Sequence, residues 1–192
     1  MLMREPLAFR MRPQKLDEVI GQRHLIDEGQ VLRRCIEEKQ ICSMIFYGPP
    51  GTGKTTLAGV IANELGVPYR LFNAVSGNKK ELDTIFEEAK YYQGLILIVD
   101  EVHRLNKDKQ DLLLPHVENG SITLIGATTS NPLHAINPAI RSRCHLFEIQ
   151  ALTHEDIKQA LLQAVHSERG LNDTVTIRED ALSFIADRCN GD

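Results

Sequence analysis

The chain has 192 residues, of which 42% are hydrophobic, and this length suits one large globular domain or one domain followed by a small one. Its net charge of −4 and sequence pI of 6.0 exclude a general positive field that would attract nucleic acid, but not a local DNA-binding surface. The longest apolar run, Leu95–Val99, is too short to cross a bilayer, and the N-terminus is charged where a signal peptide is apolar. We therefore expect a cytoplasmic protein with no membrane partner, whose four cysteines, lacking zinc-like spacing, are reduced.

Patterns typical of strands and helices alternate through the first three quarters of the chain. The predicted strands are Met44–Tyr47, Tyr69–Phe72, Leu95–Val99, Ile122–Ile125 and Cys144–Ile149. The predicted helices between them are Lys54–Leu65, Lys79–Tyr91 and Lys107–Glu118. Short apolar strands without alternation are typical of parallel sheets covered on both faces. The pattern therefore predicts an α/β fold with a five-stranded parallel sheet and helices on both faces.

The pattern changes after Leu152, where helices follow one another without a strand between them. Thr153, with Asp156 three residues later, resembles a helix start, and the helical segments are Ile157–Val165 and Asp180–Cys189. We therefore expect an α/β domain at residues 1–150 and part of a small helical domain at residues 151–192.

Residues 48–55 read GPPGTGKT and match the G-x-x-x-x-G-K-[ST] phosphate-loop pattern between a predicted strand and a predicted helix. Glycines let the backbone N–H groups point at phosphate oxygens, the helix N-terminus attracts negative charge, and the lysine adds a full positive charge. The pattern predicts ATP binding, with Mg²⁺ held partly by the Thr55 hydroxyl. The residues predicted to contact the nucleotide are Gly48, Pro49, Pro50, Gly51, Thr52, Gly53, Lys54, Thr55 and Thr56.

Asp100 and Glu101 follow the apolar strand Leu95–Val99, at the carboxyl edge where parallel sheets bind ligands. We expect Asp100 to hold Mg²⁺ through its water shell, and Glu101 to orient and deprotonate the water that attacks the γ-phosphate. The alternative for Glu101 is the first residue of a solvated turn. The seven histidines, His103 among them, have no metal-ligand spacing and are expected at the surface or in packing contacts.

These motifs together resemble the AAA+ ATPases, and the resemblance extends along nearly the entire chain. Its opening block, residues 11–22, reads MRPQKLDEVIGQ and is similar to the segment that lies against the adenine in that superfamily. The resemblance implies that Ile20 and Gly21 line the base site. The alternative is a surface helix and turn.

The resemblance also assigns polar residues at the ends of two strands. In GATTSNP, residues 126–132, it implies a sensor 1 hydroxyl for the γ-phosphate or the attacking water, and we favour Thr129 over Thr128. The alternative is a threonine pair that closes the strand by bonding backbone groups. Asn73 matches the polar position that, in many relatives, holds the catalytic glutamate in an inactive pose.

A last block, NPAIRSRC at residues 137–144, resembles the S-R-C motif of the clamp-loader branch. There the arginine enters the neighbouring subunit's ATP site and adds positive charge as the γ-phosphate leaves. The resemblance implies that Arg143 is this arginine, which is called the arginine finger. The alternatives are an ion pair of Arg143 within its own subunit, and Arg141 as the finger.

Within that branch the chain looks most like the family of replication-associated recombination protein A, and the S-R-C motif separates it from the branch-migration motor. The resemblance implies a DNA-dependent ATPase that maintains stalled replication forks in the nucleoid and acts in recombination and repair. It also implies binding to forks or single-strand/duplex junctions, association with single-stranded DNA-binding protein and assembly into homotetramers. The alternatives are a clamp-loader subunit of the polymerase holoenzyme, or a module that binds nucleotide without hydrolysing it.

The family continues beyond the equivalent of Gly191-Asp192 with a small residue and an arginine, sensor 2, which contacts the γ-phosphate from the lid. The resemblance therefore implies a truncated chain with part of the lid, which binds nucleotide but hydrolyses it slowly.

Overall fold

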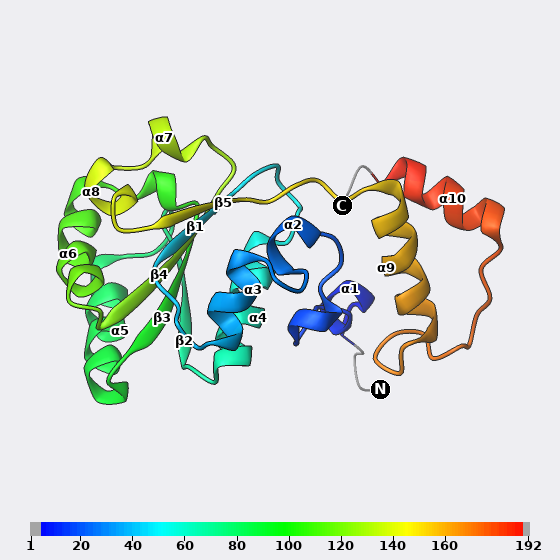
Figure 1. Ribbon diagram of the computed structural model, residues 1–192, viewed down its shortest axis with the longest axis horizontal. Coiled ribbons are helices and arrows are strands. Elements are labelled where there is room, and N and C mark those ends of the chain that lie inside the picture. Colours follow the sequence, from blue (N-terminus) through cyan, green and yellow to red (C-terminus); the bar gives the residue numbers. More distant parts are fainter. Residues whose placement is uncertain (1–4, 190–192) are drawn as a thin grey trace.

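The computed structural model describes residues 5–189, with a five-stranded parallel sheet at its centre (Figure 1). The strand order is β2-β3-β4-β1-β5, so β2 and β5 form the two edges of the sheet. The strands are β1 (Met44–Tyr47), β2 (Tyr69–Asn73), β3 (Leu95–Asp100), β4 (Ile122–Thr128) and β5 (His145–Glu148). The predicted α/β fold is confirmed, including the number and direction of the strands.

Helices cover both faces of the sheet and bury two apolar clusters. One cluster joins α3 (Val31–Glu37) and α4 (Lys54–Leu65) to one face, and the other joins α5 (Lys79–Tyr92) and α6 (Lys107–Glu118) to the opposite face. The side chains of β3 are fully buried up to Val99, which explains its continuous apolar run. The remaining elements near the sheet are α1 (Leu7–Arg10), η1 (Leu16–Glu18), α2 (Arg23–Ile26), η2 (Val102–Arg104), α7 (Pro132–Ala135) and α8 (Pro138–Arg141).

Two helices, α9 (His154–His166) and α10 (Glu179–Arg188), pack against each other at one end of the molecule (Figure 1). The predicted helix start is present. The Thr153 side chain accepts from the Asp156 backbone at 3.1 Å, and the Asp156 carboxylate accepts from the Thr153 backbone at 2.9 Å. In the part of the chain that the structure describes, no helix has both the length and the apolar character needed to cross a membrane.

The N-terminal segment is held against the loop between these two helices by contacts between residues far apart in the chain. Arg10 donates to the backbone oxygens of Arg169 and Gly170 at 2.7 and 2.8 Å, and Arg169 forms an ion pair with Glu18 at 2.7 Å. A backbone hydrogen bond from Gln14 and, to a lesser extent, this ion pair lower the pKa of the Glu18 carboxyl. The opening segment is thus attached to the helical end as well as to the sheet.

Candidate functional site

The phosphate-loop pattern forms a turn between β1 and α4, and the backbone leaves no room for a side chain at its first glycine. Gly48 has φ of 154°, and a Cβ there would lie 2.0 Å from the backbone oxygen of Ile149. Its N–H donates to the Thr128 oxygen at 3.2 Å, which ties the loop to the end of β4. Gly51 and Gly53 have φ of 73° and 81°, so they also occupy the left-handed region that glycine adopts most readily.

Alanine at Gly48 is expected to lower the free energy of unfolding by about 2 kcal/mol or more, because the Ile149 backbone must move and the left-handed strain is added. Gly29→Ala is the matched control, since Gly29 has φ of 84° but no atom within 4 Å of the place that a Cβ would occupy. Thermal unfolding should show the larger loss at Gly48, and equal losses would contradict the close contact.

Lys54, the first residue of α4, lies at the centre of the loop and is only 8% exposed. Its Nζ donates to the backbone oxygens of Gly48 at 3.0 Å and Pro49 at 2.5 Å, and to the Thr52 hydroxyl at 3.3 Å. Burial lowers the pKa of the Lys54 amine, and the charge of nearby Asp100 opposes that shift. The loop therefore encloses a cation beside the acidic end of β3.

Two carboxylates stand at that end of β3. Asp100 is the last residue of the strand, and its Oδ1 accepts from the Glu101 backbone at 3.0 Å. Glu101 is in the left-handed region with φ of 51°, and its Oε2 lies 3.1 Å from Nε of Arg104. The two neighbouring carboxylates therefore have different partners. Asp100 accepts from the backbone of the turn, whereas the partly exposed Glu101 pairs with Arg104.

The two threonines at the predicted sensor position, Thr128 and Thr129, differ in exposure. Thr128 ends β4, is 2% exposed, and its hydroxyl lies 2.8 Å from Nδ1 of His103 and accepts from the Ser130 backbone at 3.0 Å. Thr129 is exposed beyond the strand end, where a hydroxyl is accessible to a ligand. The contact of His103 with Thr128 was not predicted, because no local pattern relates residues 25 positions apart.

Asn73 lies opposite Asp100 in the pairing of β2 with β3. Its side-chain oxygen accepts from the backbones of Val75 at 2.8 Å and Ser76 at 3.0 Å, so it closes the turn after β2. No hydrogen bond joins Asn73 to Glu101 within residues 5–189. Its proposed action on the glutamate stays a prediction.

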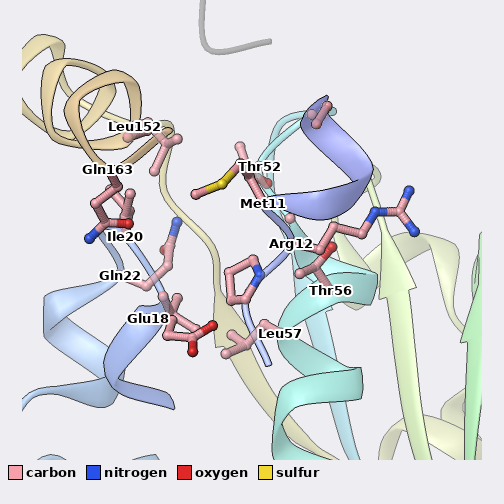
Figure 2. A pocket seen from close by; sticks show the side chains of 16 residues that line it. Met11, Arg12, Glu18, Ile20, Gln22, Thr52, Thr56, Leu57, Leu152 and Gln163 are labelled. Carbon is pink, nitrogen blue, oxygen red and sulfur yellow. The ribbon is translucent and has the colours of Figure 1, made fainter. Parts of the chain in front are cut away.

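A cavity of about 260 Å³ lies between the phosphate loop, the N-terminal segment and α9. Figure 2 shows Leu152, Gln163 and Ile20 along one side and Thr52 and Thr56 along the other. The predicted loop residues that line the cavity are Gly51, Thr52, Gly53 and Thr56. Its mainly apolar lining suits a base joined to phosphates in the loop.

The remaining predicted residues lie near this cavity without lining it. A Cβ on Gly21 would meet the Leu152 side chain at 2.8 Å, so Gly21 allows the N-terminal segment to pack on the helical end. Pro50 is exposed in the loop turn, and Thr55 is partly buried on the first turn of α4. Leu152, Ala160 and Gln163 line the cavity and were missed, because nothing in their local sequence places α9 over the loop.

The Arg143 side chain makes its contacts within its own subunit. Its Nη2 pairs with the Glu118 carboxylate, and its Nη1 donates to the Ala139 oxygen at 2.5 Å and to the Ser142 hydroxyl at 3.3 Å. Arg141, the alternative candidate for the arginine finger, donates to the backbone oxygen of Leu133 in α7. The intrasubunit ion pair considered from the sequence is therefore present in the single chain, while Arg143 itself keeps 37% of its side chain exposed.

The family described as the Holliday junction DNA helicase RuvB P-loop domain matches residues 11–139. This chain belongs to that family of AAA+ P-loop ATPases. It is 53% identical over 98% of its length to replication-associated recombination protein A of Bacillus subtilis, of which it covers 45%. It is 36% identical over 97% of its length to the ATPase WRNIP1 of Dictyostelium discoideum, of which it covers 22%.

Solved structures agree with this assignment. The Thermotoga maritima RuvB Holliday junction branch migration motor superposes with a TM-score of 0.78 and 31% identity, over 95% of this chain and 61% of that protein. The resemblance to replication-associated recombination protein A is thus confirmed, and the P-loop domain is shared with the branch-migration motor. The chain spans less than half the length of the two curated relatives.

Proposed function

We propose that this protein binds and hydrolyses ATP with Mg²⁺, and uses the energy to maintain replication forks during recombination and repair. One arrangement carries the proposal: the buried Lys54 ammonium lies in the phosphate loop, and the Asp100 and Glu101 carboxylates follow each other at the carboxyl end of β3. A cation for phosphate, a carboxylate for a metal and a second carboxylate for water are the parts that phosphoryl transfer needs. The names of the relatives, an ATPase and a replication-associated recombination protein, support the same activity.

The residues fit a Mg²⁺ ion that is shared with phosphate oxygens. Thr55 on the first turn of α4 and Asp100 at the end of β3 would hold it, the carboxylate through water. When bound, the ion neutralises charge on the β- and γ-phosphates. Glu101 is then the base that orients water, and Thr129 is the exposed hydroxyl for the γ-phosphate.

Residues 1–150 are proposed as the nucleotide-binding unit and 151–192 as part of its lid, although residues 1–4 and 190–192 lie outside the described structure. The DNA partner, single-stranded DNA-binding protein, the homotetramer and the nucleoid location are proposed from the relatives' role in replication. Phosphate release by the full-length protein should rise with forked or gapped DNA. Capture of a sliding clamp instead would favour a clamp-loader subunit, and no release with any DNA would favour a binding module.

Glu101→Gln is expected to retain ATP affinity and to lower turnover about 100-fold or more, because the amide accepts no proton from water. Glu87→Gln is the matched control: Glu87 also forms an i,i+3 ion pair, with Lys90 at 2.7 Å, but lies on α5 away from the loop. Nucleotide titration and phosphate release measure the two effects. Turnover unchanged in Glu101→Gln would remove Glu101 from the mechanism.

A further inference from the structure

Glu18 lines the nucleotide cavity (Figure 2), and its carboxylate is held by a residue that is not part of the cavity wall. Its Oε2 accepts from the Gln14 backbone at 2.9 Å and lies 2.7 Å from Nη2 of Arg169. Arg169 belongs to residues 167–178, the segment that we call the α9–α10 loop. The side chains of the ion pair are 36% and 34% exposed, so the pair is partly shielded from water.

Arg10 makes a second connection from the N-terminal segment to the same loop. Its Nη1 donates to the backbone oxygens of Arg169 at 2.7 Å and Gly170 at 2.8 Å. The next residue, Met11, lines the cavity (Figure 2) and packs on Gly170, where a Cβ would lie 3.1 Å from the Met11 sulfur. Met11 and Glu18, which belong to the same wall of the cavity, therefore both rest on the α9–α10 loop.

The α9–α10 loop is itself attached to α9, which supplies another wall of the cavity. The Leu171 N–H donates to the backbone oxygen of Ala164 at 2.8 Å. A Cβ on Gly170 would lie 2.1 Å from the same oxygen, so the loop lies directly on the helix. Because α9 contributes Ala160 and Gln163 to the cavity, the loop joins two of its walls.

The short helix η1 connects the N-terminal wall to the helix that carries the phosphate loop. The Leu16 N–H in η1 donates to Oε1 of Glu64 in α4 at 2.9 Å, and α4 begins at Lys54. Glu18, the last residue of η1, therefore lies between an attachment to α4 and an attachment to the α9–α10 loop. A wall that is fixed on both sides requires less ordering when a ligand binds, which favours affinity.

We propose that Arg169 and Arg10 are positioning residues for the base of ATP, because they hold Glu18 and Met11 in place from the α9–α10 loop. The inference rests on the proposed function, in which this cavity binds the base. Neither arginine lines the cavity, so each acts through the residues that it holds. Without Arg169, the Glu18 carboxylate keeps no cation, and the wall must be ordered at the expense of binding.

The test compares the binding of ATP and of inorganic triphosphate to the full-length protein by calorimetry, with Mg²⁺ present. Arg169→Ala should weaken ATP binding about fivefold or more, and Arg10→Ala should act in the same direction. The affinity for triphosphate should stay within about twofold, because this probe has no base to place in the cavity. In turnover, KM for ATP should rise by the same factor while kcat stays within about twofold, the pattern of lost uniform binding.

Arg33→Ala is the matched control, because Arg33 forms an ion pair at 3.1 Å with Asp17 of the same helix, η1, but neither residue lines the cavity. It should leave both affinities within about twofold. A double-mutant cycle with Glu18→Gln identifies the partner of Arg169. Since both substitutions weaken one ion pair, the double variant should lose no more ATP affinity than the weaker-binding single variant.

Three results would overturn the assignment of the two arginines: unchanged ATP affinity in Arg169→Ala, losses that multiply in the double variant, or equal losses of ATP and triphosphate affinity. Equal losses would show general damage to the fold instead of a misplaced base wall. Calorimetry requires no hydrolysis. An unaltered protein that binds both probes but releases no phosphate with any DNA would therefore count against the proposed function alone.

Discussion

Replacing Lys54 by alanine is expected to lower ATP affinity by about 30-fold or more, because charge-assisted hydrogen bonds to phosphate are lost. The ammonium is 8% exposed and is surrounded by the loop oxygens of Gly48 and Pro49. Those oxygens cannot bind an anion, so the lysine alone supplies the full positive charge at the centre of the loop. Titration with a fluorescent ATP analogue measures the affinity directly.

Lys107→Ala is the matched control, because Lys107 is also the first residue of a twelve-residue helix, α6, but is exposed. Both substitutions remove a lysine from the first turn, where the helix dipole disfavours a cation, so their effects on helix stability are similar. Only Lys54→Ala should weaken nucleotide binding. Equal affinities of the two variants for ATP would show that the loop is not the phosphate site.

The strands could be predicted because each is a short apolar run that ends at a polar or turn residue. The prediction for β4 ended at Ile125, yet the strand continues to Thr128. Gly126 directly follows the predicted end, but here it lies within the strand and is required for packing, since a Cβ would lie 2.9 Å from the Val102 side chain. A glycine that allows close approach and a glycine that ends a strand look the same in sequence.

Several short helices were not predicted for a related reason. α3, seven residues long, and the four-residue α7 and α8 are too short for a clear 3.6-residue apolar period. Asn131 and Asn137 cap α7 and α8 through their side-chain oxygens, each followed by proline. These N-terminal signals were present in the sequence, but a signal for helix initiation does not specify how far the helix continues.

The candidate site was predicted where its chemistry lies within one motif and was missed where it depends on tertiary packing. Two parts of the site are local patterns whose chemistry requires particular residue types at a fixed spacing: the phosphate loop, Gly48 to Thr56, and the Asp100-Glu101 pair. By contrast, the bond of Gln22 to the Gln150 backbone at 2.8 Å joins residues 128 positions apart. Such contacts bring α9 over the base cavity, and only the packed chain specifies them.

Arg143→Ala is expected to leave ATP affinity within about twofold, and to lower turnover by the assembled full-length protein about 1,000-fold, the size of an arginine-finger effect. The side chain contacts Glu118 and Ala139 of its own chain, not the phosphate loop, so binding does not require it. The chain alone should therefore hydrolyse ATP slowly, with or without Arg143. Phosphate release at increasing protein concentration distinguishes these states.

Mixing experiments then assign the arginine to the neighbour's site. Glu101→Gln chains have an inactive site but an intact finger, whereas Arg143→Ala chains have an intact site and no finger. A mixture should recover part of the turnover that each lacks alone, since a Glu101→Gln finger enters an Arg143→Ala site. Arg141→Ala is the comparison, because Arg141 donates to the Leu133 backbone and is expected to support α7 instead.

The expected loss of turnover in Arg143→Ala depends on how easily Arg143 leaves its ion pair with Glu118. Arg143 is exposed enough to leave Glu118, and an exposed ion pair stabilises the chain by no more than about 1 kcal/mol. A γ-phosphate offers several anionic oxygens in a partly closed site, where a charge-assisted bond is stronger. Arg143 should therefore exchange its carboxylate for phosphate whenever a neighbour brings one within reach. Normal turnover in Arg143→Ala, with no recovery in any mixture, would mean that the ion pair with Glu118 is its whole role.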